Sequence, residues 1–151
     1  MSAQRDVVVQ TVADALTASM DRARTELDTL RASLTKETKS TAGDKHETGR
    51  AMVQLEIEQA GQRFSRVEAM SSVFRRLNPE QPRKEAGPGA WVECGAGNFF
   101  IGVPLGALQL PDGTKFHAIS SDAPLAVVLR GAVAGSTVEF RGAQCEVVRV
   151  G

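Results

Sequence analysis

Two acidic residues near the middle of the chain, Asp44 and Glu47, have a spacing that could support metal chemistry. Mg²⁺ prefers carboxylate oxygens and keeps several of its water ligands, so two acids can hold it without a closed protein cage. Residues three apart share one face of a helix, and the two carboxylates can act together if a helix begins here. The same spacing fits a capping box, with Asp44 after Gly43 as the cap. Spacing alone favours that structural role.

Long heptad-patterned segments lie on both sides of these acids, with apolar residues at alternating steps of three and four. Each segment has about 30 residues, which at about 1.5 Å per residue gives a rod of roughly 45 Å. We therefore predict an antiparallel coiled-coil hairpin over residues 1–80, with an acidic tip near 43–47. The apolar positions are Val9, Val12, Leu16, Met20, Ala23, Leu27, Leu30 and Leu34, then Val53, Ile57, Ala60, Phe64, Val67, Phe74 and Leu77, with Ser71 as the polar exception.

The second half of the chain changes to a β pattern. Prolines and glycines between residues 79 and 89 interrupt any helix and predict an exposed linker over 81–89. Beyond it, short runs rich in β-branched and aromatic residues predict a small, mostly antiparallel β domain over 90–151. The predicted fold class is α+β. The predicted strands are Trp91–Cys94, Phe99–Val103, Thr114–Ile119, Thr137–Phe140 and Cys145–Val150.

One short helix is predicted inside this β pattern. Asp122 can cap it, Pro124 is tolerated in its first turn, and Gly131 can end it. Its apolar face would consist of Leu125, Val128 and Leu129. The segment from Gly87 to Gly151 is expected to be self-contained and to fold alone.

Composition excludes several classes of function. Basic and acidic residues number 18 each and are balanced in both halves of the chain, which argues against strong direct DNA binding. No apolar run approaches the roughly 20 residues that span a bilayer, so a cytoplasmic protein without membrane contact is expected. Cys94 and Cys145 lack C-x-x-C spacing and are expected to be buried, reduced thiols. His46 and Glu47 could begin the H-E-x-x-H motif of zinc proteases, but Arg50 stands where the second histidine is needed, so a zinc protease is excluded.

Two motifs at separate places in the chain resemble the bacterial Gre transcript-cleavage factors. The family tip reads G-D-L-x-E-N-A-E-Y, and Gly43, Asp44 and Glu47 match its spacing, whereas Thr48–Met52 does not. The family's C-terminal signature reads I-S-x-x-S-P-L-A-x-x-L-x-G-K-x-x-G-D. The residues that fall on it are Ile119, Ser120, Pro124, Leu125, Ala126, Leu129, Gly131 and Gly135, while Ala123, Ala132 and Ser136 depart from it.

The resemblance implies an accessory factor that binds RNA polymerase and is not itself an enzyme. Its FKBP-like C-terminal domain would dock on the rim of the polymerase secondary channel, and its coiled coil would enter the channel and stimulate cleavage of the backtracked RNA 3′ end. Asp44 would be the principal ligand of Mg²⁺ held jointly with the polymerase, and Glu47 would assist the metal or orient the attacking water. The free protein would bind no cofactor and would be a monomer. The implied docking residues are Ser120, Ser121, Asp122, Pro124 and Leu125.

Two other functions stay open at this stage. A non-cleaving regulator could enter the same channel, and this is favoured by the nearly neutral stretch 35–50, which holds four basic and three acidic residues. An FKBP-like chaperone or prolyl isomerase is a weaker alternative, because the β domain has no tyrosine and few aromatic residues to line a proline pocket.

Overall fold

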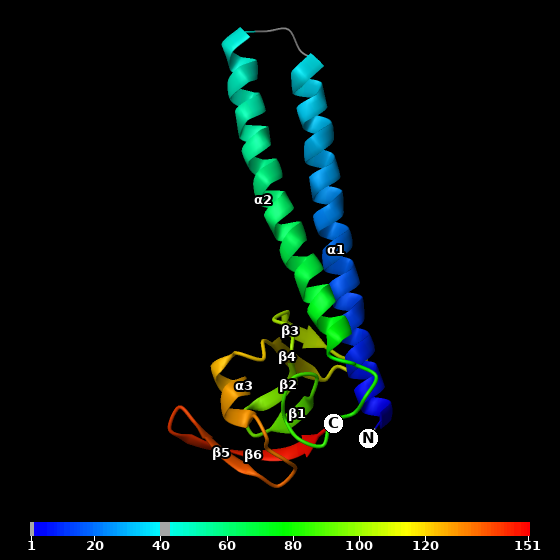
Figure 1. Ribbon diagram of the computed structural model, residues 1–151, viewed down its shortest axis with the longest axis vertical. Coiled ribbons are helices and arrows are strands. Elements are labelled where there is room, and N and C mark those ends of the chain that lie inside the picture. Colours follow the sequence, from blue (N-terminus) through cyan, green and yellow to red (C-terminus); the bar gives the residue numbers. More distant parts are fainter. Residues whose placement is uncertain (1, 40–42) are drawn as a thin grey trace. The chain divides into compact units, whose positions relative to one another are not determined.

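The computed structural model describes the backbone of residues 2–39 and 43–151 and the side chains of residues 4–36 and 48–151. Two long helices are followed by a six-stranded mixed sheet that carries one short helix (Figure 1). The predicted α+β class is therefore confirmed. Among the described residues, no helix is both long and apolar enough to cross a membrane.

Helices α1 (Ser2–Lys39) and α2 (Gly43–Arg76) both extend further toward the middle of the chain than the heptad pattern indicated. At about 1.5 Å per residue they are roughly 57 Å and 51 Å long. The chain divides into two compact units: one is Thr17–Ala69, and the other combines Met1–Leu16 with Met70–Gly151. The division falls within both helices, whereas the sequence pattern placed the boundary after them.

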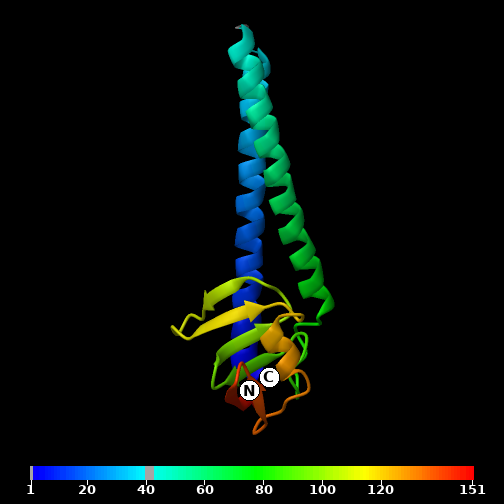
Figure 2. The same ribbon diagram turned by 90° about the vertical axis from the view of Figure 1, so that its left-hand side faces the viewer.

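Within Thr17–Ala69, α1 and α2 lie side by side and antiparallel (Figures 1 and 2). Ala23, Leu27 and Ala60 are buried in the seam between them, as the heptad pattern predicts. Outside the seam, Arg63 forms an ion pair with Glu26. Both side chains are exposed, so this pair contributes at most about 1 kcal/mol.

The six strands form one sheet in the order β3-β4-β2-β1-β6-β5. Neighbouring strands are antiparallel except β2 and β4, which are parallel, so the predicted mainly antiparallel sheet is confirmed. The strand β3 was not predicted, because its four residues include a glycine and are mostly exposed, which leaves no alternation to detect. The strands are β1 (Trp91–Cys94), β2 (Gly97–Ile101), β3 (Gly106–Gln109), β4 (Lys115–Ile119), β5 (Thr137–Phe140) and β6 (Ala143–Val150).

Successive residues of β1 and β2 point into two different apolar clusters, because side chains alternate between the faces of a sheet. Val92 and Ile101 belong to the cluster that also contains Ala126 and Leu129 of α3 (Pro124–Leu129). Trp91 and Phe100 belong to the other cluster. That second cluster also contains Val8, Val12 and Leu16 of α1, Phe74 of α2, and Val103, Leu110 and Phe116.

The β domain is consequently not self-contained from residue 87 onward. Trp91 and Phe100 are fully buried, and part of that burial comes from α1 and α2 residues in the same compact unit. Trp91 also contacts Phe116 edge to face at 5.4 Å between ring centroids. A fragment starting at Gly87 would expose this apolar surface and would be less stable than the whole unit. That it folds alone stays a prediction.

Segment 81–89, predicted as an exposed linker, is mostly exposed, but Ala86 and Gly89 within it are buried and fixed by hydrogen bonds. The Gly89 N–H donates to the Ile101 carbonyl of β2 at 2.7 Å. The Ala86 N–H donates to the Ala132 carbonyl at 2.7 Å, and the Gly131 N–H donates to the Ala86 carbonyl at 2.8 Å. Arg83 donates to the carbonyl oxygens of Leu77, Asn78, Gln81 and Pro88. One guanidinium thus donates to four carbonyl groups within this segment and just before it.

Arg5 of α1 is a buried cation, with only 2% of its surface exposed. Its guanidinium donates to the carbonyl oxygens of Gly151 at 2.8 Å and Pro79 at 3.1 Å. Burial, and secondarily the positive charge of Arg83, lowers the pKa of Arg5. Arg5 therefore joins α1 to the end of the sheet and to the chain just after α2, all within one compact unit.

Two adjacent valines of β6 provide a matched test of the sheet's buried faces. Val147 is fully buried, whereas Val148 is 63% exposed. Val147→Ala should reduce the free energy of unfolding by about 2 kcal/mol, since two buried methyl groups are lost, and Val148→Ala by less than about 0.5 kcal/mol. Urea unfolding of both variants measures the difference. Equal losses would contradict the assignment of the two faces.

The two cysteines are free thiols buried in one cluster, as predicted from their spacing. Cys145 Sγ accepts a hydrogen bond from the Ala96 N–H at 3.3 Å. Burial, together with a hydrogen bond to Cys145, raises the pKa of Cys94 from 9.0 to about 11.

The raised pKa of Cys94 makes stability depend on pH in the alkaline range. The unfolded thiol ionises near pH 9.0 and the folded thiol near about 11, so this contribution is complete below pH 9 and is lost as pH rises toward 11. Cys94→Ala should therefore lose less stability than the unaltered protein between about pH 8 and about pH 10.5. Urea unfolding at both pH values tests this. Identical losses in the two proteins would show that Cys94 is not the group responsible.

Candidate functional site

The contacts between α1 and α2 locate the end of the hairpin. Arg24 lies over the ring of Phe64, with 5.8 Å between its guanidinium carbon and the ring centroid, and Glu26 pairs with Arg63. In both pairs the midpoint between the two residue numbers falls at or next to residue 44. In an antiparallel hairpin this midpoint marks the end where the chain reverses, so the first turn of α2 lies at the hairpin's end. Asp44 belongs to this turn.

Asp44 and Glu47 are both helical residues near the start of α2, which begins at Gly43. Their side chains lie outside the described residues, so the expectation that they share one face of the helix stays a prediction from their three-residue separation. Because the cap geometry of α2 is not described, the capping alternative stays open beside metal delivery. Carboxylates at this end also benefit from the positive pole of the helix dipole.

Two carboxylates on one side of a helical turn suit a hard cation that is bound mainly by another molecule. Their oxygens match the ligand preference of Mg²⁺, and two ligands leave most of its coordination positions for water or a partner. Within the described side chains, 4–36 and 48–151, no three His, Cys, Asp or Glu residues gather as potential metal ligands. Asp44 and Glu47 are not covered by that statement.

The second predicted site, Ser120 to Leu125, forms the turn that leads into α3. Ser120 Oγ accepts a hydrogen bond from the Asp122 N–H at 3.2 Å, and the Ser120 carbonyl accepts one from Ala123 at 3.1 Å. Ala123 occupies the cap position without a side-chain cap, so the prediction that Asp122 caps the helix is wrong. Asp122 is exposed, and its carboxylate forms no hydrogen bond or ion pair in the described part of the chain.

Helix α3 divides into a buried side and an exposed side. Ala126 and Leu129 are buried, and Leu125 packs partly against them. Val128 was predicted on the buried side but is 37% exposed, and Val127 is 50% exposed. The remaining predicted docking residues are also accessible, with Pro124 exposed and Ser120 and Ser121 half-buried.

The exposed valines are functional candidates that sequence reasoning missed. The pattern from Pro124 to Leu129 is apolar at every position, so it does not reveal which side faces the sheet. Exposed apolar residues next to a polar turn are suited to a protein contact in which a few anchors supply most of the affinity. The turn 120–123 and the exposed side of α3 together form what we call the α3 surface.

The chain was compared with models of known protein families and with curated proteins, and neither comparison found a match. The resemblance to the Gre factors therefore depends on the hairpin's end and on the residues around α3.

The two sides of α3 can be separated by mutation. Leu129→Ala should lower the free energy of unfolding by about 2–5 kcal/mol because it empties a fully buried site. Val127→Ala should change it by less than about 0.5 kcal/mol, since half of that side chain is already in solvent. Thermal and urea unfolding of both variants measures this. A large loss in Val127→Ala would remove it from the α3 surface.

Proposed function

We propose that this protein is a Gre-like accessory factor that binds bacterial RNA polymerase and stimulates cleavage of the 3′ end of backtracked RNA. The observation that carries the proposal is the position of Asp44 and Glu47 in the helical turn at the end of an antiparallel hairpin. The factor acts as a monomer in the cytoplasm, and cleavage takes place in the polymerase active site. The α+β unit is proposed to be FKBP-like.

The proposed chemistry requires carboxylates that arrive on a narrow support. Phosphodiester hydrolysis in a two-metal site uses one cation to activate water and another to stabilise the leaving oxygen. Mg²⁺ shared with the polymerase supplies that activation when it is bound. Asp44 would provide an oxygen ligand to it, and Glu47 would assist in holding the metal or would orient the attacking water. A helical hairpin suits this task because two helices have a smaller cross-section than a globular domain.

The α3 surface is proposed to dock the factor on the rim of the secondary channel. Asp122 and Pro124 are exposed, and Ser120, Ser121 and Leu125 are partly accessible beside them. Val127 adds an exposed apolar anchor that does not hold the domain together. Docking and metal delivery therefore use different residues, and each can be removed without the other.

A non-cleaving channel regulator is the second candidate, and one observation favours it. The segment 35–50 carries Lys36, Lys39, Lys45 and Arg50 beside three acidic residues, so the hairpin's end has little net charge. A nearly neutral end attracts a divalent cation less strongly over distance than an acidic one. Such a protein would compete for polymerase and leave cleavage unchanged.

Replacing both acids by their amides tests the proposed chemistry. Asp44→Asn with Glu47→Gln keeps side-chain size and removes both negative charges. Stimulated RNA cleavage by stalled polymerase complexes with Mg²⁺ should fall to the level without factor, because neutral amides are poorer ligands for a hard cation. Affinity for polymerase, measured by competition with labelled unaltered protein, should stay within about twofold, or about 0.4 kcal/mol.

Glu56→Gln with Glu58→Gln is the matched control, because it removes two exposed carboxylates further along the same helix. This variant should stimulate cleavage normally. If the amide variant at positions 44 and 47 cleaves as well as the control, metal delivery is excluded. If the unaltered protein binds polymerase but never stimulates cleavage, the regulator candidate replaces the first.

A further inference from the structure

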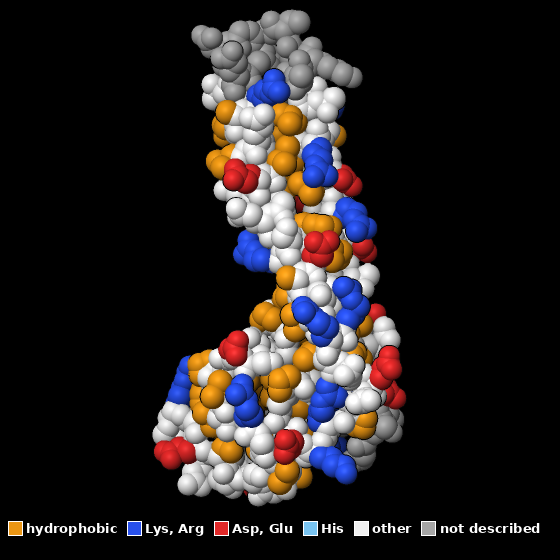
Figure 3. Space-filling view, in the orientation of Figure 1, with side chains coloured by type: hydrophobic (Ala, Val, Ile, Leu, Met, Phe, Trp, Pro, Cys, Tyr) orange, Lys and Arg blue, Asp and Glu red, His pale blue; other side chains and the backbone are white. Residues whose placement is uncertain are grey.

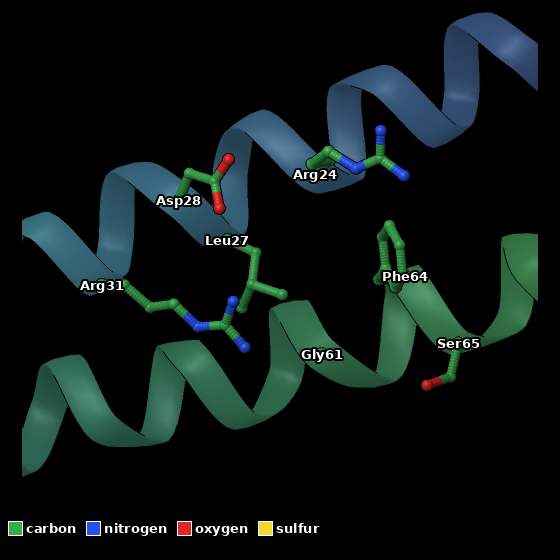
Figure 4. A pocket seen from close by; sticks show the side chains of 7 residues that line it. All are labelled: Arg24, Leu27, Asp28, Arg31, Gly61, Phe64 and Ser65. Carbon is green, nitrogen blue, oxygen red and sulfur yellow. The ribbon is translucent and has the colours of Figure 1, made fainter.

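A hollow of about 390 Å³ lies on the hairpin between α1 and α2, wholly within the unit Thr17–Ala69. Figure 4 shows Leu27 and Phe64 pointing from opposite helices into the space between them, with Arg24 and Arg31 extending beside them. We call it the α1–α2 hollow. Its lining residues are Arg24, Leu27, Asp28, Arg31, Gly61 and Phe64, together with Ser65.

Gly61 lines the hollow and contributes no side chain to it. It does not have a positive φ, and a Cβ built on it would meet no atom within 4 Å, so neither backbone conformation nor close packing requires glycine there. Glycine inside a helix costs about 1 kcal/mol relative to alanine. The preceding residue, Ala60, is fully buried in the seam, so the helices do pack at this level. Glycine therefore costs helix stability at a position where the fold does not require it. Its missing side chain leaves a space that another molecule can fill.

Two arginines at the hollow have no carboxylate partner among the described residues. Arg24 lies over the Phe64 ring and Arg31 reaches toward Gly61, whereas their neighbour Arg63 is paired with Glu26. Asp28 also lines the hollow, one helical turn from each arginine on α1, but it forms no ion pair with either among the described residues. The hollow therefore combines an apolar floor with two guanidinium groups that are free to bind an incoming acid, which each can do through two parallel hydrogen bonds.

We propose that the α1–α2 hollow binds a segment of a partner protein that presents an aliphatic or aromatic side chain flanked by carboxylates. The apolar side chain fills the space above Gly61, in contact with Leu27 and Phe64. The flanking carboxylates pair with Arg24 and Arg31. This site is separate from the acids at the hairpin's end and does not depend on the proposed transcription function.

A nucleic acid fits the hollow less well than a protein. Residues 20–31 and 58–68 contain five basic and five acidic residues, and Figure 3 shows both signs of charge interspersed along the hairpin. Binding to a phosphate backbone relies on a net positive surface. The apolar floor formed by Leu27 and Phe64 offers nothing to a phosphate group, whereas an aliphatic side chain gains from burial there.

The probes are fluorescein-labelled dodecapeptides with one central Leu or Phe and two Glu on each side. Matched peptides replace the central residue by Ser, or the four Glu by Lys. Amide resonances of the ¹⁵N-labelled full chain are followed by NMR during titration. Saturable shifts are expected at Gly61 and Ser65 with the acidic apolar peptides and not with either matched set. If no such peptide gives saturable shifts up to a few millimolar, a range that covers interactions of about −3 to −4 kcal/mol, the proposal is overturned.

Gly61→Leu fills the hollow and should reduce peptide affinity at least about tenfold, equivalent to about 1.4 kcal/mol. The variant should remain folded, since leucine has a higher helix propensity than glycine. Arg24→Gln with Arg31→Gln should also weaken binding and reduce its dependence on salt. The control is Arg22→Gln with Arg66→Gln, two exposed arginines of the same helices outside the lining. Equal weakening in this control would indicate unspecific attraction and overturn the site.

Two further outcomes would assign the hollow to another occupant. If a single-stranded RNA oligonucleotide displaces the peptides and itself binds more tightly through Arg24 and Arg31, the site is for nucleic acid. If sedimentation shows a dimer that Gly61→Leu dissociates, the occupant is a second copy of this chain. Either result excludes the proposed partner segment. Neither bears on the amide variants at positions 44 and 47, so this inference and the transcription function can fail separately.

Discussion

Alternation of side chains along β1 and β2 is the constraint on which the larger unit depends. Trp91 and Phe100 enter one apolar cluster, while their neighbours Val92 and Ile101 enter the other. A sheet buried on both faces needs a cover on each, and here α3 supplies one while parts of α1 and α2 supply the other. The long helices are therefore part of the domain's core, and the β strands cannot complete that core without them.

The hairpin unit has a different physical character. Its seam buries small residues such as Ala23 and Ala60, and the ion pair between Glu26 and Arg63 is exposed to solvent. The hairpin unit therefore gains less stability from apolar burial than the sheet does. Its stability depends more on the helix propensity of its residues and on unbroken helices. Regions with few buried apolar contacts open locally at lower free energy than a domain core. A glycine at position 61 lowers helix propensity further in this unit.

Sequence patterns predicted the regular parts of the fold and missed features that depend on tertiary contacts. The bounds of β1 and β5 were predicted correctly, because runs of β-branched and aromatic residues end at glycine-containing turns. Val128 was placed on the wrong side of α3, since a wholly apolar run carries no periodic signal. A buried Arg5 could not be foreseen, because its carbonyl partners at Pro79 and Gly151 are distant in sequence. Asp44 and Glu47 could be named from the sequence, but their spacing alone favoured a cap, and only the resemblance at both ends of the chain favoured metal delivery.

The same distinction explains why the candidate sites differ in how far sequence can define them. The acids at the hairpin's end need only a helix that starts at the right residue, so a local motif specifies the arrangement. The α1–α2 hollow requires Gly61 of one helix to face Leu27 of the other, and this depends on the antiparallel register set by the whole seam. A heptad pattern indicates which residues are apolar but not which two meet across the seam. Sites of the first kind can therefore be transferred between proteins as motifs, whereas sites of the second kind have to be found in the structure of each chain.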